Sequence, residues 1–182
     1  RSNGVLLAQV CPVGGRLSGK SSVVQLDAWN WEDAAYNADE GQHLNWPSAF
    51  SYNWRRGTFG KNKRYSEQVT DLDAFFKDAK AYNMLAADAH EVSNLKLEAM
   101  RAVFDGDANL YIHVNSAREI QESILFAEKY GITPVIVGGV EAYKIADFLV
   151  EHQVPVILNR VTSLPYGTDT DIDMPFKKAS VL

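Results

Sequence analysis

The sequence predicts an α/β fold in which a parallel sheet is covered by helices. Apolar runs in the second half alternate with amphipathic stretches and begin roughly 20 to 25 residues apart, as in βαβ units. The 182 residues are 46% hydrophobic and 23% charged, which fits a globular domain and excludes a collagen, a coiled coil and wholesale disorder. Two architectures compete, a partial (β/α)8 TIM-like barrel and an open doubly wound sheet. The expected strands are too few for a whole barrel, which needs about 250 residues.

The first half of the chain carries weaker signals. A short apolar run at 5–10 predicts a buried strand, and residues 22–26 predict a second, shorter one. At 27–63 the periodicity fades among Trp, Tyr, Asn and Gly residues, so we expect an irregular segment that serves a site or an interface. Helices are expected at 66–81 and 97–104, the first because its apolar residues recur at helical spacing.

The second half shows the alternation most clearly. We expect strands at 110–114, 134–137 and 154–158, separated by helices at 116–130 and 141–153. These three strands and the first strand of the chain are predicted to be parallel neighbours in one curved sheet, with the helices outside.

We expect a single domain spanning residues 1–182. The chain begins without Met and ends within an apolar segment, so we expect truncated termini, with missing barrel segments or a second chain covering the sheet edges. Neither a signal peptide nor a membrane span is visible in it, and a cytoplasmic and a periplasmic location stay open. A net charge of −5 argues against a nucleic-acid binder.

A glycine-rich segment resembles a nucleotide-binding loop. Residues 14–21 read GGRLSGKS and satisfy the pattern G-x-x-x-x-G-K-[ST] after an apolar strand. Such a loop needs a helix that begins at Lys20, whereas the residues that follow are β-branched and favour a strand. We therefore expect a glycine-rich turn, and a P-loop nucleotide binder is the least favoured function.

Polar residues and glycines lie where the strands of the second half end. The carboxyl ends of parallel strands form the rim of the active site in α/β proteins, which makes His113, Gly138 and Arg160 candidate site residues. His113 is either a functional residue or a hydrogen-bonded core histidine, and Arg160 either clamps an anion or forms a salt bridge at the rim. The other histidines are expected to be structural or exposed; they are His43, His90 and His152.

Several segments together resemble the metal-dependent amidohydrolases, in particular the imidazolonepropionase-related branch. They are LYIHVN at 110–115, VIVGGVEAYKIAD at 135–147, PVIL at 155–158 and SLP at 163–165, with PVGGRLSGKS at 12–21 and LDAWNWE at 26–32 in the first half. The resemblance covers the chain from about residue 4 to its end, and it implies the central part of a (β/α)8 barrel, with parallel strands and outer helices.

The resemblance implies hydrolysis of carbon–nitrogen bonds, amide or cyclic amide, in a small-molecule substrate. Members of the family hold one or two divalent metals, often zinc. His113 matches the metal ligand of the fifth barrel strand and would be catalytic, whereas the ligand of the sixth strand falls at Gly138, which has no side chain to coordinate with. Asn115, Gly138 and Arg160 would face the substrate. The remaining ligands would lie outside this chain, so the fragment alone is expected to be inactive.

A different class of function stays open. The alternative is a degenerate, non-catalytic barrel that binds a ligand or a partner through the aromatic-rich segment 29–54. The glycine at the expected ligand position favours this alternative, and the histidine at the end of the preceding strand favours the enzyme.

Overall fold

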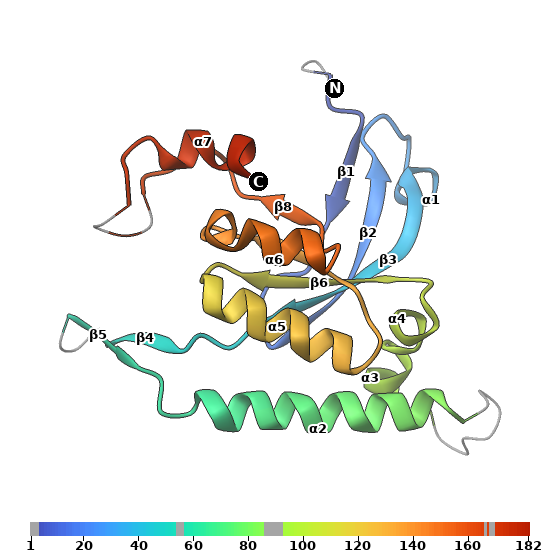
Figure 1. The fold of residues 1–182 in the computed structure, drawn as a ribbon. Helices are drawn as coiled ribbons and strands as arrows, with labels where there is room; N and C mark the ends of the chain where they lie inside the picture. The colour runs from blue at the N-terminus through green and yellow to red at the C-terminus, as the bar shows by residue number, and fades with distance from the viewer. Residues whose placement is uncertain (1–3, 54–56, 86–92, 166, 168–169) are drawn as a thin grey trace. The chain divides into compact units, whose positions relative to one another are not determined.

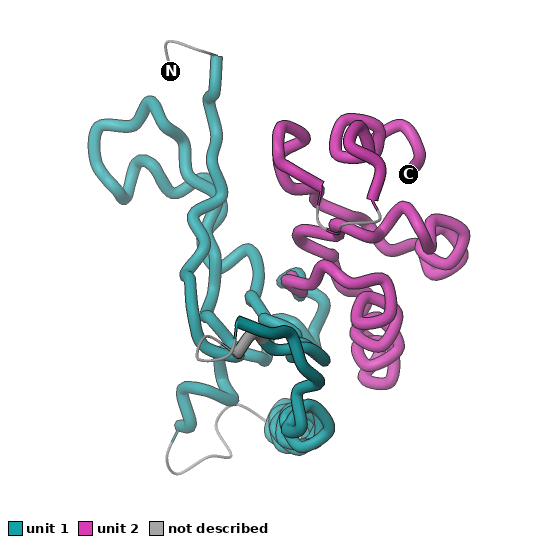
Figure 2. The backbone as a smooth tube through the Cα atoms, turned by 90° about the vertical axis from the view of Figure 1, so that its left-hand side faces the viewer, with its two compact units in different colours: residues 1–110 teal, residues 111–182 magenta. Residues whose placement is uncertain are grey.

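The structure is a computed structural model that describes residues 4–53, 57–85, 93–165, 167 and 170–182. It has a mixed α/β fold and divides into two compact units, Arg1–Leu110 and Tyr111–Leu182, drawn in teal and magenta in Figure 2. The prediction of one domain over residues 1–182 stays a prediction.

Unit 1 is built on three neighbouring strands, β1 (Leu7–Val10), β2 (Leu17–Gln25) and β3 (Ala35–Asn45), which are antiparallel (Figure 1). The prediction that the first strand is a parallel neighbour in the sheet is therefore wrong: β1 forms a hairpin with β2. The connection between them is too short for the crossover that a parallel pair requires. It reverses at Gly14 and Gly15, whose φ angles of 100° and 71° suit glycine.

The prediction of an irregular segment at 27–63 is also wrong. It contains a helical turn, α1 (Trp31–Ala34), the strand β3 and a separate hairpin of β4 (Phe50–Asn53) and β5 (Thr58–Lys61). The first residues of β3 are exposed, so no alternation of apolar and polar residues marks them as a strand. Register shifts between β2 and β3 disturb the pattern further.

A long helix, α2 (Tyr65–Asn83), confirms the prediction for 66–81. Its buried residues recur every three or four positions and form one apolar face; they are Leu72, Phe76, Ala79 and Tyr82. The helix expected at 97–104 is split into α3 (Leu95–Glu98) and α4 (Arg101–Asp105), and α4 ends at Gly106 with a φ of 83°. No helix in the described ranges has both the length and the hydrophobicity to cross a bilayer.

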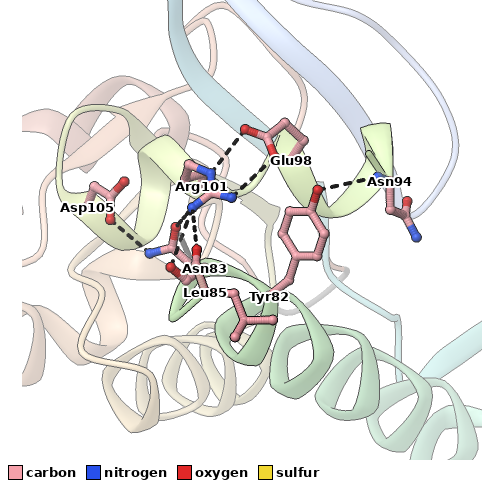
Figure 3. A network of polar contacts seen from close by, with 7 residues as sticks. All are labelled: Tyr82, Asn83, Leu85, Asn94, Glu98, Arg101 and Asp105. Carbon is pink, nitrogen blue, oxygen red and sulfur yellow. Dashed lines mark hydrogen bonds and ion pairs between the residues drawn. The ribbon is translucent and has the colours of Figure 1, made fainter. Parts of the chain in front are cut away.

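Arg101 connects the end of α2 to the two short helices (Figure 3). Its guanidinium group donates to both carboxylate oxygens of Glu98, at 3.0 and 3.3 Å, and to the backbone oxygens of Asn83 and Leu85, each at 3.4 Å. The same group lies over the ring of Tyr82, 5.4 Å from the ring centroid. One side chain thereby holds together segments that are far apart along the chain.

Unit 2 follows the predicted alternation. Strands β6 (Asn109–Val114), β7 (Pro134–Gly138) and β8 (Val156–Leu158) are neighbours in that order, and β7 and β8 are parallel. The connections contain α5 (Ala117–Lys129), and a short 3₁₀ helix, η2 (Ala142–Ile145), that continues into α6 (Ala146–Glu151). A last helix, α7 (Met174–Val181), follows β8. Helix α5 lies against β7.

Candidate functional site

The segments that follow the three strands of unit 2 line one cavity of about 620 Å³. Asn115 comes directly after β6, Glu141 comes after β7, and Arg160 comes after β8. The segment after β8 and helix α7 supply the rest of the wall. The lining residues are Asn115, Val140, Glu141, Tyr143, Asn159, Arg160, Ser163, Leu164, Thr170, Met174, Pro175 and Lys178. The structure therefore brings the predicted residues Asn115 and Arg160 together.

The cavity contains a buried cation. Lys178 is only 3% exposed, and within the described ranges its ammonium group forms no hydrogen bond or ion pair with another residue. Lysine is almost never buried to this degree unless its charge is paired. Arg160 lines the same cavity and adds a second positive charge. The pair makes the cavity suitable for an anionic group.

The carboxylate of Glu141, in the cavity wall, already accepts two hydrogen bonds. One oxygen of Glu141 accepts a hydrogen bond from Nζ of Lys144 at 2.7 Å, and the other accepts one from the backbone N–H of Ala117 at 2.9 Å. Although burial by itself raises it, the pKa of Glu141 is lowered from its ordinary value, because both groups donate to the ionised carboxylate. Glu141 therefore fixes the start of α5 and does not neutralise Lys178.

Gly138 lies against Asn115. A Cβ at position 138 would be 2.6 Å from Oδ1 of Asn115 and 3.3 Å from the carbonyl oxygen of Val114, and the φ of Gly138 is 101°. The room that a larger side chain needs is thus taken by Asn115. Oδ1 of Asn115 is itself buried and accepts no hydrogen bond from the described residues. Gly138 packs against Asn115 and is not among the residues that line the cavity.

His113 lies in β6, between the buried residues Ile112 and Val114, and is half-buried. Burial lowers the pKa of its imidazole from the ordinary value of 6.5, so the neutral ring is favoured. His113 is not among the lining residues of the cavity. Its assignment as a catalytic residue and metal ligand stays a prediction.

The described residues do not by themselves form a metal site. Among them, no group of three or more His, Cys, Asp or Glu side chains could hold a metal ion. Gly138, at the position where the resemblance implies a ligand, offers no donor, and a ligating side chain there would displace Asn115.

The other candidate residues lie outside the cavity of unit 2. Lys20 lies within β2 and pairs with Asp39 at 3.2 Å, which confirms that it does not begin a phosphate-binding helix. His43 is buried in β3, and His152 follows α6 and contacts Glu128 and the ring of Phe148. His90 lies outside the described residues.

Lys178 is the site residue that sequence reasoning missed. It lies three and four positions after Pro175 and Met174, so it occupies the buried face of α7, whereas its neighbour Lys177 is exposed and pairs with Asp173. In the sequence, the signal for such a buried charge is a lysine spaced three or four residues from the apolar residues of a helix.

No protein-family model matches the chain, and no curated protein matches it. Among solved structures, the chain is similar to an amidohydrolase from Thermotoga maritima MSB8, with a TM-score of 0.76 and 22% sequence identity. The similarity covers 98% of this chain and 48% of the other, so the chain spans about half the length of that protein. It therefore has an amidohydrolase-like fold.

Proposed function

We propose that the protein is a hydrolase of the amidohydrolase type that cleaves a carbon–nitrogen bond in a small anionic substrate. In this proposal the chain is the central part of a (β/α)8 barrel of the imidazolonepropionase-related branch. The amidohydrolase-like fold supports the reaction class. The observation that carries the substrate class is Lys178, a buried cation without a partner among the described residues, in a cavity that it shares with Arg160.

The residues of the chain have distinct tasks in this proposal. Lys178 and Arg160 bind the anionic group of the substrate, most simply a carboxylate, through charge-assisted hydrogen bonds. Asn115 lines the cavity and faces the substrate, and the contact of its Oδ1 with Gly138 fixes the position of its side chain. Glu141 holds the start of α5 in place and so keeps the cavity wall rigid.

A divalent metal, with zinc as the proposed ion, would activate water for the reaction. His113 is the residue of this chain that we propose as a ligand, and the other ligands would have to come from outside the described residues. In the full-length protein, His113→Ala should then lower zinc content and turnover together, whereas His152→Ala should leave both nearly unchanged. Retention of zinc and activity in His113→Ala would refute the assignment.

The second candidate function is ligand or partner binding without catalysis. It is favoured by Asn115, which fills the space that a side chain at position 138 needs. Trp29 and Trp31, in the aromatic-rich segment 29–54, are 95% and 79% exposed and would be available to a partner, whereas Trp46 is buried. Trp54 lies outside the described residues.

The test uses the full-length protein and a simple dicarboxylate. Glutarate binding is measured by calorimetry, zinc by elemental analysis, and hydrolysis with a panel of N-acyl amino acids and cyclic amides. We expect Lys178→Met and Arg160→Met each to weaken glutarate binding about tenfold or more, since each removes a charge-assisted contact. Lys177→Met is the matched control, one position along the same helix, and should bind as the unmodified protein does.

The outcomes separate the candidates. Hydrolysis, together with glutarate binding that depends on Lys178, supports the hydrolase. Binding that depends on Lys178 without zinc or hydrolysis supports the non-catalytic alternative. Glutarate binding that is unaffected by Lys178→Met and Arg160→Met overturns the anionic substrate class.

A further inference from the structure

A second cavity, of about 700 Å³, lies entirely within unit 1 and is independent of the proposed function. Residues of β2 and β3 form part of its wall, and α2, α3 and the residues after α3 form the rest. The lining residues are Arg16, Leu17, Gly19, Lys20, Gln42, Gln68, Asp71, Leu72, Phe75, Leu95, Lys96, Ala99 and Met100. The volume is within the range of small-molecule sites.

The wall of this cavity is largely apolar. Leu72, on α2, is 3% exposed, and Met100, after α3, is 1% exposed. Phe75, also on α2, is half-buried. Leu95, by contrast, is 79% exposed and lies in the short helix α3, so it lines the cavity where it opens to solvent. The cavity therefore has a buried apolar wall, against which the apolar part of a ligand can pack, and an opening to solvent.

One polar group in the wall lacks a partner. Gln42 is 4% exposed, and its Oε1 is buried and accepts no hydrogen bond from any residue in the described part of the chain. Gln42 is paired with Lys20 in the register of β2 and β3, and both residues line the cavity. A buried amide oxygen is costly unless a donor reaches it. A molecule in the cavity with an O–H or N–H group would supply that donor.

The wall of the cavity carries three cations and the anion Asp71, and Asp39 beside it reduces the net charge to +1. The ammonium group of Lys20 is bound to Asp39, and the guanidinium group of Arg16 donates to the backbone oxygen of Asn45 at 2.9 Å. Lys96 and Asp71 have opposite charges. The wall therefore does not select a strongly charged ligand, in contrast to the cavity in unit 2.

We propose that the cavity in unit 1 binds an uncharged amphipathic small molecule. The ligand has an apolar aromatic or aliphatic body, which packs against Leu72, Phe75 and Met100, and one hydroxyl or amide group, which donates a hydrogen bond to Oε1 of Gln42. No covalent step takes place, and the site is a binding site only.

The proposal is tested with two probes that differ in a single donor. The probe 4-butylphenol carries a hydroxyl that donates, and 4-butylanisole has the same body with a methoxy group that only accepts. Binding to the full-length protein is measured by calorimetry and by NMR. We expect one molecule of the phenol to bind per chain, about fivefold or more tightly than the anisole, the value of one net hydrogen bond.

Two variants locate the site. Gln42→Met keeps the size of the side chain and removes the acceptor, so it should reduce phenol affinity to that of the anisole. Leu95→Trp narrows the entrance and should weaken both probes; Leu95 is exposed, so this variant should fold normally even if Gln42→Met does not. Leu125→Trp, at an exposed position of α5, is the control and should change neither affinity.

Three results would overturn the proposal. If neither probe binds the full-length protein, another part of the protein fills the cavity. If the two probes bind equally well, Gln42 does not select a donor. If Leu95→Trp leaves both affinities unchanged, the probes bind elsewhere.

Discussion

Units 1 and 2 differ in how clearly the amino-acid sequence marks their strands. In unit 2, short apolar strands alternate with α5 and α6 along the sequence. In unit 1, β2 and β3 are long, partly exposed on both faces and shifted in register. Buried parallel strands are marked by apolar runs in the sequence, whereas a strand with polar residues on both faces, such as β3, carries no such mark.

The two cavities differ in a similar way. The cavity in unit 2 lies where three strands end and contains the cations Lys178 and Arg160. The cavity in unit 1 lies along strands and a helix face, is largely apolar, and contains the unpartnered acceptor of Gln42. We therefore expect the two cavities to bind ligands of different charge.

The largest effect is expected from the packed core of unit 1. Phe76 is fully buried on α2 and packs edge-to-face against Phe75 and Phe104. Phe76→Ala should reduce the free energy of unfolding by about 3–5 kcal/mol, because it leaves a cavity. Denaturant unfolding followed by circular dichroism measures the loss. The control is Phe59→Ala, at a position that is 79% exposed, where a loss as large as that of Phe76→Ala would contradict the assignment of the core.

The next effect is expected at the strand ends of unit 2. Gly138→Ala places a Cβ 2.6 Å from Oδ1 of Asn115 in a backbone conformation that favours glycine, and should cost about 1–3 kcal/mol. Gly131→Ala is the matched control, since its φ is 80° but no atom lies within 4 Å of the added Cβ. Thermal unfolding should show the larger loss for Gly138→Ala. Equal losses would mean that Asn115 does not restrict position 138.

A smaller effect is expected from Arg101, which connects α2 to α3 and α4. Arg101→Met keeps much of the side chain's length but removes its hydrogen bonds to Glu98, Asn83 and Leu85. Hydrogen exchange of the backbone amides at 94–101 should become faster, with little change in unit 2. Arg118→Met, which removes an exposed pair with Glu122 on α5, should leave exchange at 94–101 unchanged.

The smallest effect is expected from the pH dependence of His113. Burial lowers its pKa from 6.5, so the unfolded chain binds a proton more readily than the folded one. The contribution to stability is therefore present above pH 6.5 and is lost as the pH falls through the lowered pKa of the folded state. Thermal unfolding between pH 7.5 and pH 5 should show a weaker pH dependence in His113→Asn. An unchanged dependence would show that the ring is not buried in its neutral form.

Much of unit 2 could be predicted from the sequence, because helix periodicity and apolar strands are local properties. The prediction placed β6, β7 and β8 and their helices, and it selected Asn115 and Arg160 as residues at strand ends. It also excluded a helix at Lys20, since β-branched residues follow it, although it expected a turn at 14–21 and a strand only from residue 22, whereas β2 begins at Leu17.

The other features depend on tertiary contacts. The antiparallel pairing of β1 with β2 depends on the turn at Gly14 and Gly15, and the strand β3 is held by its partner and not by its own pattern. Lys178 became a site residue because α7 places it in the wall of a cavity with Arg160, which lies far from it in the sequence. Oε1 of Gln42 has no donor among the described residues, because the donors that share the cavity wall with it do not reach it. Burial and partnership are properties of neighbours in space, so a sequence pattern determines them only where those neighbours are also close along the chain.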